Sequence, residues 1–255
     1  MPISPNFTSL YSQTHEVDFL ECAPSGKLKT AAIGQILQKV ANTHSILGGI
    51  SLEDLQRTQI AWVLNKMKIE IVKLPQWQDV IEIQTWIQSL EGSRSIRDFE
   101  VFLNGEKIMG ISTFWVIIDT EKRRPGTITI PLDHFTIFES KKALKKGFSK
   151  FPLHLPFEKI SENSVRYSDL DMVNHVNNTK YVEWVLDAVP FDKIMHQDFK
   201  EIEMVFKREM VYGMPYEVNH HADQADRDTY SISHGSSTYF ICHLSWKPRG
   251  EKAQQ

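Results

Sequence analysis

Two stretches decide the fold, VDFLECAPSGKLKTAAIGQILQKVA at residues 17–41 and VRYSDLDMVNHVNNTKYVEWVLDAV at residues 165–189, because they align without gaps at an offset of 148. Few residues are identical, but the apolar positions coincide. The matched pairs are Val17 with Val165, Phe19 with Tyr167, Ile33 with Tyr181, Ile36 with Trp184, Leu37 with Val185 and Val40 with Ala188. The last four pairs have i, i+3, i+4, i+7 spacing, which is typical of one apolar face on a helix. The chain therefore contains an internal repeat.

Each copy of the repeat predicts one long helix followed by a run of antiparallel strands. The first helix is expected at 30–47, and the second runs to about Asp187, near Pro190. An Asn104-Gly105 pair between two strands is a strong hairpin signal. The expected strands are 16–20, 61–72, 80–90, 95–103 and 107–118 in the first copy, and 165–167, 201–212, 216–222, 229–234 and 237–246 in the second. One helix can cover one face of an antiparallel sheet, so the fold class is α+β.

The repeat divides the chain into three parts, with domains expected at 1–120 and 164–255 and a linker at 121–163. The linker is rich in proline and contains the lysine run KKALKKGFSK at 141–150. Such a composition is typical of a segment that wraps a protein surface. The lysine run is more often a solvated face than a docking site.

The composition excludes several classes of protein. The 255 residues are 41% hydrophobic and 24% charged, as in an ordinary soluble domain, and the net charge of −3 disfavours nucleic acid as a partner. No apolar stretch approaches a membrane span, and the first residues do not resemble a secretory signal. The two cysteines, Cys22 and Cys242, suggest no disulfide framework, so a cytoplasmic location is expected.

The stretch SDLDMVNHVNNTKYVEW at 168–184 is dense in polar groups just before the second predicted helix. Asp171 and His175 are four residues apart, and Asn177 or Asn178 is a suitable N-cap. A carboxylate beside a helix N-terminus can activate water or attack a carbonyl. These side chains could instead only build the turn. The first copy decides between the two interpretations, because it has Ala23 and Lys27 at the matching positions. One half is therefore expected to be a scaffold and the other to carry the chemistry.

The same segment, DLDMVNHVNNTKYVEW, is similar to the signature of the acyl-acyl carrier protein thioesterases. The resemblance spans residues 18 to about 246 and includes THSILGG at 43–49, IAWVLNKMKIEIVKLPQWQDVIEIQTW at 60–86 and FWVIID at 114–119. It implies two tandem hotdog folds, each a long helix wrapped by an antiparallel sheet. It also implies hydrolysis of a fatty acyl thioester on carrier protein, with the first half binding the acyl chain and the second half catalytic.

The resemblance assigns catalytic roles to three residues of this sequence, Asp171, His175 and Glu209. The family usually has Asn two residues after the Asp, where this chain has Val173, so Asn174 next to it is a candidate substitute. Asn177 is included because the thioester carbonyl is expected to meet backbone N–H groups near 174–177. The family often has Cys after the Glu, where this chain has Met210, which favours a carboxylate mechanism. Without the family, Glu209 aligns with Ile69, and an outward charge on a strand is the simpler interpretation.

The acyl chain is expected, by resemblance, between the first helix and its sheet. Candidate lining residues are Ile33, Leu37, Val40, Trp62, Leu64, Trp86, Phe99 and Phe114. Ordinary core packing is the alternative for each of them. The expected partner is acidic acyl carrier protein, which would be steered by basic residues. The candidates are Arg123, Arg124, Lys141, Lys142, Lys145, Lys146, Lys207 and Arg208.

No cofactor and no metal are expected, because no histidine or cysteine pair has zinc-motif spacing. Assembly as a homodimer is left open. Two alternative functions also stay open: an acyl-CoA thioesterase of the hotdog class, and a non-catalytic acyl-binding protein on the same fold.

Overall fold

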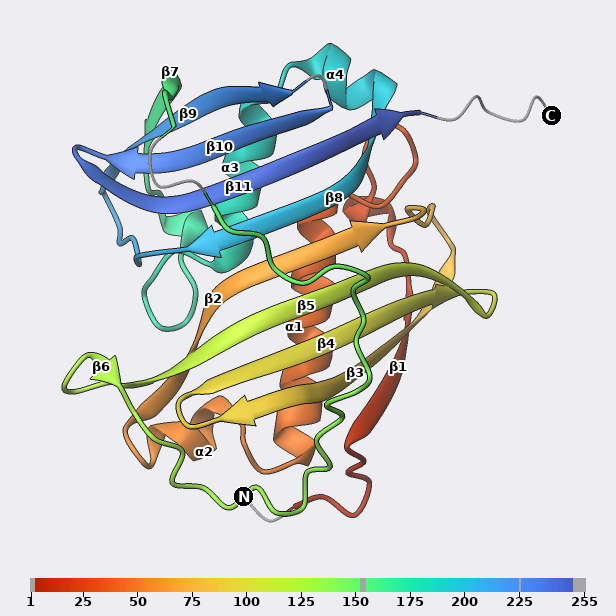
Figure 1. Ribbon diagram of the computed structural model, residues 1–255, viewed down its shortest axis with the longest axis vertical. Coiled ribbons are helices and arrows are strands. Elements are labelled where there is room, and N and C mark those ends of the chain that lie inside the picture. The colour runs from red at the N-terminus through yellow and green to blue at the C-terminus, as the bar shows by residue number, and fades with distance from the viewer. Residues whose placement is uncertain (1–2, 152–154, 225, 250–255) are drawn as a thin grey trace. The chain divides into compact units, whose positions relative to one another are not determined.

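Each copy of the repeat folds into its own unit in the computed structural model, which describes residues 3–151, 155–224 and 226–249 (Figure 1). Unit 1 is Met1–Gly147 and unit 2 is Phe148–Gln255. Both units contain one longer helix against an antiparallel sheet, so the predicted α+β class is confirmed. The predicted linker is thereby shared between the two units.

The sheet of unit 1 has the strand order β1-β3-β4-β5-β2. Its elements are β1 (Leu10–Glu16), a 3₁₀ turn (Phe19–Glu21), α1 (Thr30–Leu47), α2 (Leu52–Gln56), β2 (Ile60–Ile71), β3 (Val80–Glu91), β4 (Arg94–Leu103), β5 (Glu106–Asp119) and β6 (Arg124–Pro125). The Asn104-Gly105 turn joins β4 to β5 with both residues at positive φ, which confirms the predicted hairpin. The buried residues of α1 include Ile33, Leu37 and Val40, on one face.

The sheet of unit 2 has the strand order β8-β11-β10-β9-β7. Its elements are β7 (Glu158–Ser164), a 3₁₀ turn (Tyr167–Asp169), α3 (Asn178–Ala188), α4 (Phe191–His196), β8 (Gln197–Phe206), β9 (Pro215–Gln224), β10 (Arg227–His234) and β11 (Ser237–Pro248). The helix α3 begins at its N-cap Asn177, whose side-chain oxygen accepts a hydrogen bond from the backbone N–H of Thr179.

Three sequence predictions about elements were wrong. The strands expected at 16–20 and 165–167 are instead turns, which follow β1 and β7. The strand expected at 201–212 ends at Phe206, because the N–H groups of Lys207 and Arg208 both donate to the carbonyl of Tyr239 and the chain then leaves the ladder. The short helices α2 and α4 were not expected.

Residues 138–147, here called the strap, cross the face of the unit 1 sheet opposite α1 (Figure 1). The indole N–H of Trp86 donates to the carbonyl of Lys141 at 2.9 Å, and the N–H of Ala143 donates to Asp98 at 2.9 Å. A Cβ on Gly110 would lie 2.2 Å from the carbonyl oxygen of Ala143, so only glycine allows this approach. The strap is therefore fixed to the sheet, as the wrapping prediction expected.

Candidate active site

The turn between β7 and α3 reproduces the turn between β1 and α1 at the offset of 148. The strands Leu10–Glu16 and Glu158–Ser164, the two 3₁₀ turns, and the first residues of α1 and α3 all differ by 148. The isolated bridge Cys22–Leu28 in unit 1 matches the bridge Leu170–Val176 in unit 2 in the same way. The internal repeat predicted from sequence therefore extends to the backbone pairing.

Hydrogen bonds inside the two turns also match one for one. The N–H of Asp171 donates to the carbonyl of His175 at 2.8 Å, as the N–H of Ala23 does to that of Lys27 at 2.8 Å. Asn174 has φ +63°, where the first copy has a glycine, Gly26, at +75°. Since Ala23 and Lys27 support the same backbone, the carboxylate and the imidazole of unit 2 are not required to fold it.

The side chain of Asp171 uses only one of its two oxygens to stabilise the turn. Its Oδ1 accepts hydrogen bonds from the N–H groups of Val173 at 3.0 Å and His175 at 3.2 Å. Within the part of the chain that the structure describes, Oδ2 makes no hydrogen bond. Asp171 is half-buried, so Oδ2 can receive a proton from water or attack a carbonyl.

His175 and Glu209 face each other, with 3.6 Å between Nε2 and Oε2 and 31% of each side chain exposed. Glu209 lies beyond the end of β8, in a segment fixed by the hydrogen bond from the N–H of Val176 to the carbonyl of Met210 at 2.9 Å. In unit 1 the N–H of Leu28 donates to the carbonyl of Pro75 in the same way. The residue that matches Glu209 is therefore Leu74, so the alignment with Ile69 was wrong.

The backbone N–H groups of residues 174–177 are already occupied. They donate, in order, to the carbonyl of Asp171, to its Oδ1, to the carbonyl of Met210 and to that of Asp169. The expectation that these groups receive the thioester carbonyl was therefore wrong. The N–H of Asn178 is the first of α3 and has no partner within the helix, so it is the nearest group of this kind left for an oxyanion.

Tyr181 is a residue that the sequence reasoning assigned only to the apolar stripe. Its ring is buried, and its hydroxyl donates to the carbonyl of Arg208 at 3.5 Å, next to Glu209. Burial raises the pKa of this phenol, and the nearby carboxylates of Glu209 and Asp171 raise it further. Its position four residues after the N-cap Asn177 could have indicated contact with the site. Tyr181 therefore holds the segment that carries Glu209.

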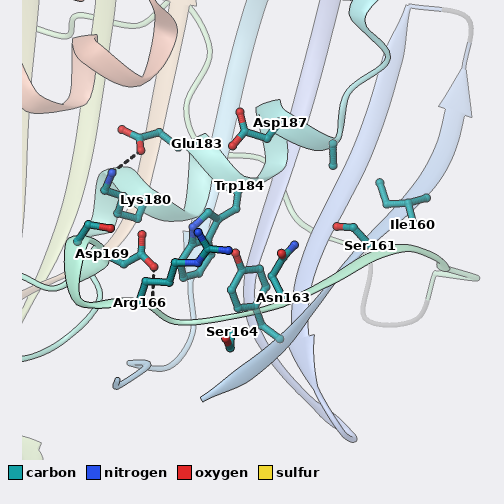
Figure 2. A pocket seen from close by; sticks show the side chains of 13 residues that line it. Ile160, Ser161, Asn163, Ser164, Arg166, Asp169, Lys180, Glu183, Trp184 and Asp187 are labelled. Atoms are coloured by element: carbon teal, nitrogen blue, oxygen red, sulfur yellow. Dashed lines mark hydrogen bonds and ion pairs between the residues drawn. The ribbon is translucent and has the colours of Figure 1, made fainter. Parts of the chain in front are cut away.

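A second polar feature of unit 2 is a groove of about 540 Å³ between β7 and α3 (Figure 2). Its lining includes Arg166 and Asp169 from the turn, and Lys180 and Trp184 from α3. None of Asp171, His175 and Glu209 lines this groove. The ring of Trp184 stacks on Tyr216 with 4.0 Å between centroids, which fixes the wall formed by α3.

The residues expected around the acyl chain do not all share one face of the unit 1 sheet. Leu64 pairs with Trp115 and Trp62 with Ile117, on the side of Arg97, whose guanidinium bonds to His44 of α1. Trp86 pairs with Asp98, and Phe114 pairs with Ile96, so both lie on the face under the strap. The face of α1 is left with Ile33, Leu37, Val40, Trp62, Leu64 and Phe99.

Over residues 3–151, 155–224 and 226–249, no group of three or more His, Cys, Asp or Glu side chains has a geometry that could hold a metal ion. In the same ranges no helix has the length and apolar character that crossing a membrane requires.

Two matched hotdog units, one with an acid–imidazole–acid cluster at its helix N-terminus, define a protein of the hotdog class. Models of the acyl-ACP thioesterase N-terminal and C-terminal domains match residues 8–132 and 156–247. The chain belongs to the acyl-ACP thioesterase family.

Relatives of known name agree with this assignment. The chain is 30% identical over 213 residues to an oleoyl-acyl carrier protein thioesterase of Coriandrum sativum, covering 74% of this chain and 57% of the relative. It is 32% identical over 202 residues to oleoyl-acyl carrier protein thioesterase 2 of Arabidopsis thaliana, covering 71% and 55%. The chain thus spans little more than half the length of these relatives.

Solved structures show the same fold. An acyl-ACP thioesterase from Bacteroides thetaiotaomicron superposes with a TM-score of 0.88 at 19% identity, covering 94% of this chain and 98% of the other. The 12:0-ACP thioesterase from Umbellularia californica gives a TM-score of 0.80 at 21% identity, covering 95% and 98%. The predicted tandem hotdog fold is confirmed.

Proposed function

We propose that the protein hydrolyses the thioester of fatty acyl-acyl carrier protein and releases a free fatty acid. The observation that carries the proposal is the Asp171 carboxylate, with one oxygen open, beside the contact of His175 with Glu209. The turn that presents these groups is built in unit 1 without them. Because the fold does not require these side chains, a catalytic role is the best explanation for their presence.

The cleavage follows from the positions of these groups. Oδ2 of Asp171 either takes a proton from the water that attacks the thioester carbonyl or attacks that carbonyl itself. The carboxylate of Glu209, with Oε2 3.6 Å from Nε2 of His175, orients the imidazole electrostatically, while Asn177 and Tyr181 position the turn and the Glu209 segment. The N–H of Asn178 stabilises the oxyanion. When water attacks, the C–S bond then breaks and the free acid is released. When Asp171 attacks, the C–S bond breaks to leave an anhydride between the acyl group and Asp171, which water hydrolyses in a second step. The thiolate is a good leaving group, so neither route requires a strong acid.

The division of roles between the units is part of the proposal. Unit 2 carries the chemistry and unit 1 binds the acyl chain, along the α1 face that carries Leu37 and Leu64. Domain bounds of 1–120 and 164–255 with a linker between them, a cytoplasmic location and homodimer assembly stay predictions. The relatives are named for oleoyl, palmitoyl and dodecanoyl substrates, so the family name alone does not give the acyl length.

The decisive experiment incubates the purified protein with carrier protein loaded with acyl groups of varying length and identifies the free acids. The proposal predicts turnover that is lost in Asp171→Asn. The same acyl group on CoA is the comparison: a higher kcat/KM on CoA would favour the acyl-CoA thioesterase. Bound acyl chain without any thioester cleavage would establish the non-catalytic binder instead.

A further inference from the structure

Exposed apolar side chains of unit 2 gather around the candidate active site. Seven large hydrophobic side chains are exposed among the described residues of this unit, and five of them lie in two short segments, 165–176 and 207–214. These five are here called the apolar rim: Tyr167, Met172, Val173, Val211 and Tyr212. Met172 is 87% exposed and Tyr167 is 84% exposed. A cluster of this kind on a folded protein usually marks an interaction site.

The two segments are held side by side, so the rim is one surface. The N–H of Val165 donates to the carbonyl of Met214 at 2.9 Å, and the N–H of Gly213 donates to that of Val165 at 3.0 Å. The other end is fixed by the bond from Val176 to Met210. The contact of His175 with Glu209 joins the same two segments. A partner bound to the rim therefore lies next to the residues of the candidate active site.

The charged residues beside the apolar rim indicate which kind of partner it binds. Arg166, Lys207 and Arg208 are all exposed in these segments. The acidic residues between them do not face outward in the same way. Asp169 is buried and accepts the N–H of Arg166, while Asp171 and Glu209 belong to the site. An apolar surface rich in tyrosine and methionine with a basic border fits an acidic protein that exposes an apolar patch of its own.

We propose that the apolar rim and its basic border dock the acidic carrier protein that delivers the acyl group. This inference rests on the proposed function and adds where the partner binds. Tyr167, Tyr212 and Met172 supply contact area, as aromatic and methionine side chains do at interface centres. Lys207 and Arg208 steer the acidic partner and contribute more to the association rate than to the lifetime of the complex. The carrier would then present its thioester beside Asp171.

The first copy of the repeat provides a matched control. Phe19 occupies the position of Tyr167 and is 68% exposed, and Trp77 occupies that of Tyr212 and is 52% exposed. Their rings touch, with centroids 6.0 Å apart, on a turn of the same backbone. Phe19→Ser with Trp77→Ser therefore removes a similar apolar area from unit 1 without touching the rim.

The experiment compares kcat/KM for one acyl group carried by acyl carrier protein and by pantetheine alone. Tyr167→Ser with Tyr212→Ser, and separately Lys207→Glu, should lower kcat/KM on the carrier substrate about tenfold or more, chiefly through KM. The ratio to the pantetheine substrate should fall by the same factor. Equal losses on both substrates, no loss on either, or an equal loss in the Phe19/Trp77 control would overturn the proposal.

Direct binding separates the docking surface from the chemistry. Titration with holo carrier protein, which has no acyl group, should give saturable binding that the rim variants weaken about tenfold. If no thioester is cleaved but this binding and its loss are seen, the proposed hydrolysis fails and the docking surface stands. If the rim variants change the oligomeric state measured by light scattering and leave carrier binding intact, a second copy covers the rim and the proposal is wrong.

Discussion

Substitutions at Asp171 test whether its carboxylate takes part in the reaction or only stabilises the turn. Asp171→Ala removes two hydrogen bonds, from the N–H groups of Val173 and His175. The turn is partly exposed, so water replaces part of this interaction and the loss should be about 1–2 kcal/mol in total. For a chain of this size that corresponds to a fall of roughly 2–8 °C in Tm. Ala23, which folds the same turn in unit 1, supports the lower part of this range.

The effect on catalysis should be far larger. Loss of a general base or nucleophile typically lowers kcat by about 10²–10⁴-fold, which is roughly 3–5 kcal/mol in the activation free energy. Asp171→Asn is the sharper variant, because its amide oxygen can still accept both turn hydrogen bonds while Oδ2 becomes a nitrogen. It should therefore combine an almost unchanged Tm with the full loss of kcat.

The assay pairs single-turnover hydrolysis of an acyl thioester with thermal unfolding of the same samples. Ala23→Asp, which places a carboxylate on the matched turn of unit 1, is the control and should change neither kcat nor Tm by much. If Asp171→Asn keeps kcat within about threefold of the parent protein, the catalytic assignment is refuted. If Asp171→Ala loses more than about 4 kcal/mol of unfolding free energy, the carboxylate is structural after all.

Three further predictions follow from other parts of the structure. Glu209→Gln keeps the shape but not the charge opposite His175, so kcat should fall with KM little changed; an unchanged kcat would exclude the contact from the reaction. Gly110→Ala places a Cβ against the carbonyl of Ala143 and should cost about 1–3 kcal/mol in urea unfolding, whereas a neutral result would mean that the strap can shift. Burial first, and then the charge of Arg97, lower the pKa of His44 from 6.5 to about 3. The unfolded chain therefore binds the extra proton between these values, and about 2–3 kcal/mol of stability should be lost from pH 7 to pH 4.5. His44→Gln should flatten that slope in urea titrations.

The two long helices, α1 and α3, and the central strands could be predicted because their burial leaves a periodic pattern of apolar residues in the sequence. The edge strands could not. β1 reads LYSQTHE and β7 reads EKISENS, and neither has a clear apolar face. Edge strands are paired on one side only and are often polar, so hydrophobic periodicity does not reveal them. Val17 and Val165 are almost fully buried but lie just after the strands, which placed the expected strands too late.

Glu209 shows a different limit of sequence reasoning. The stretch EIEMVFKREMVY continues the alternation of a strand past Phe206, so nothing local marks where the ladder ends. The strand ends where the N–H groups of Lys207 and Arg208 both donate to the carbonyl of Tyr239, and the following segment is held by a long-range bond from the N–H of Val176 to the carbonyl of Met210. That bond draws Glu209 toward His175 and makes Leu74 its counterpart in unit 1. Pairing between segments about 35 residues apart in sequence carries no local signal.

The shared backbone of the two turns also explains how one copy can carry catalytic side chains without a change of fold. Every main-chain hydrogen bond that shapes the turn is present where Ala23, Lys27 and Leu74 stand, so the free energy of the turn is supplied by the backbone and its apolar neighbours. An acid and an imidazole added to this backbone do not have to stabilise the fold. They can therefore gain or lose protons during the reaction without unfolding the turn. If the turn depended on hydrogen bonds to a catalytic carboxylate, each protonation of that carboxylate would weaken those bonds and destabilise the turn. In Asp171 both turn hydrogen bonds fall on Oδ1, so Oδ2 is left for the substrate, and the turn itself is held by backbone bonds that Ala23 makes as well.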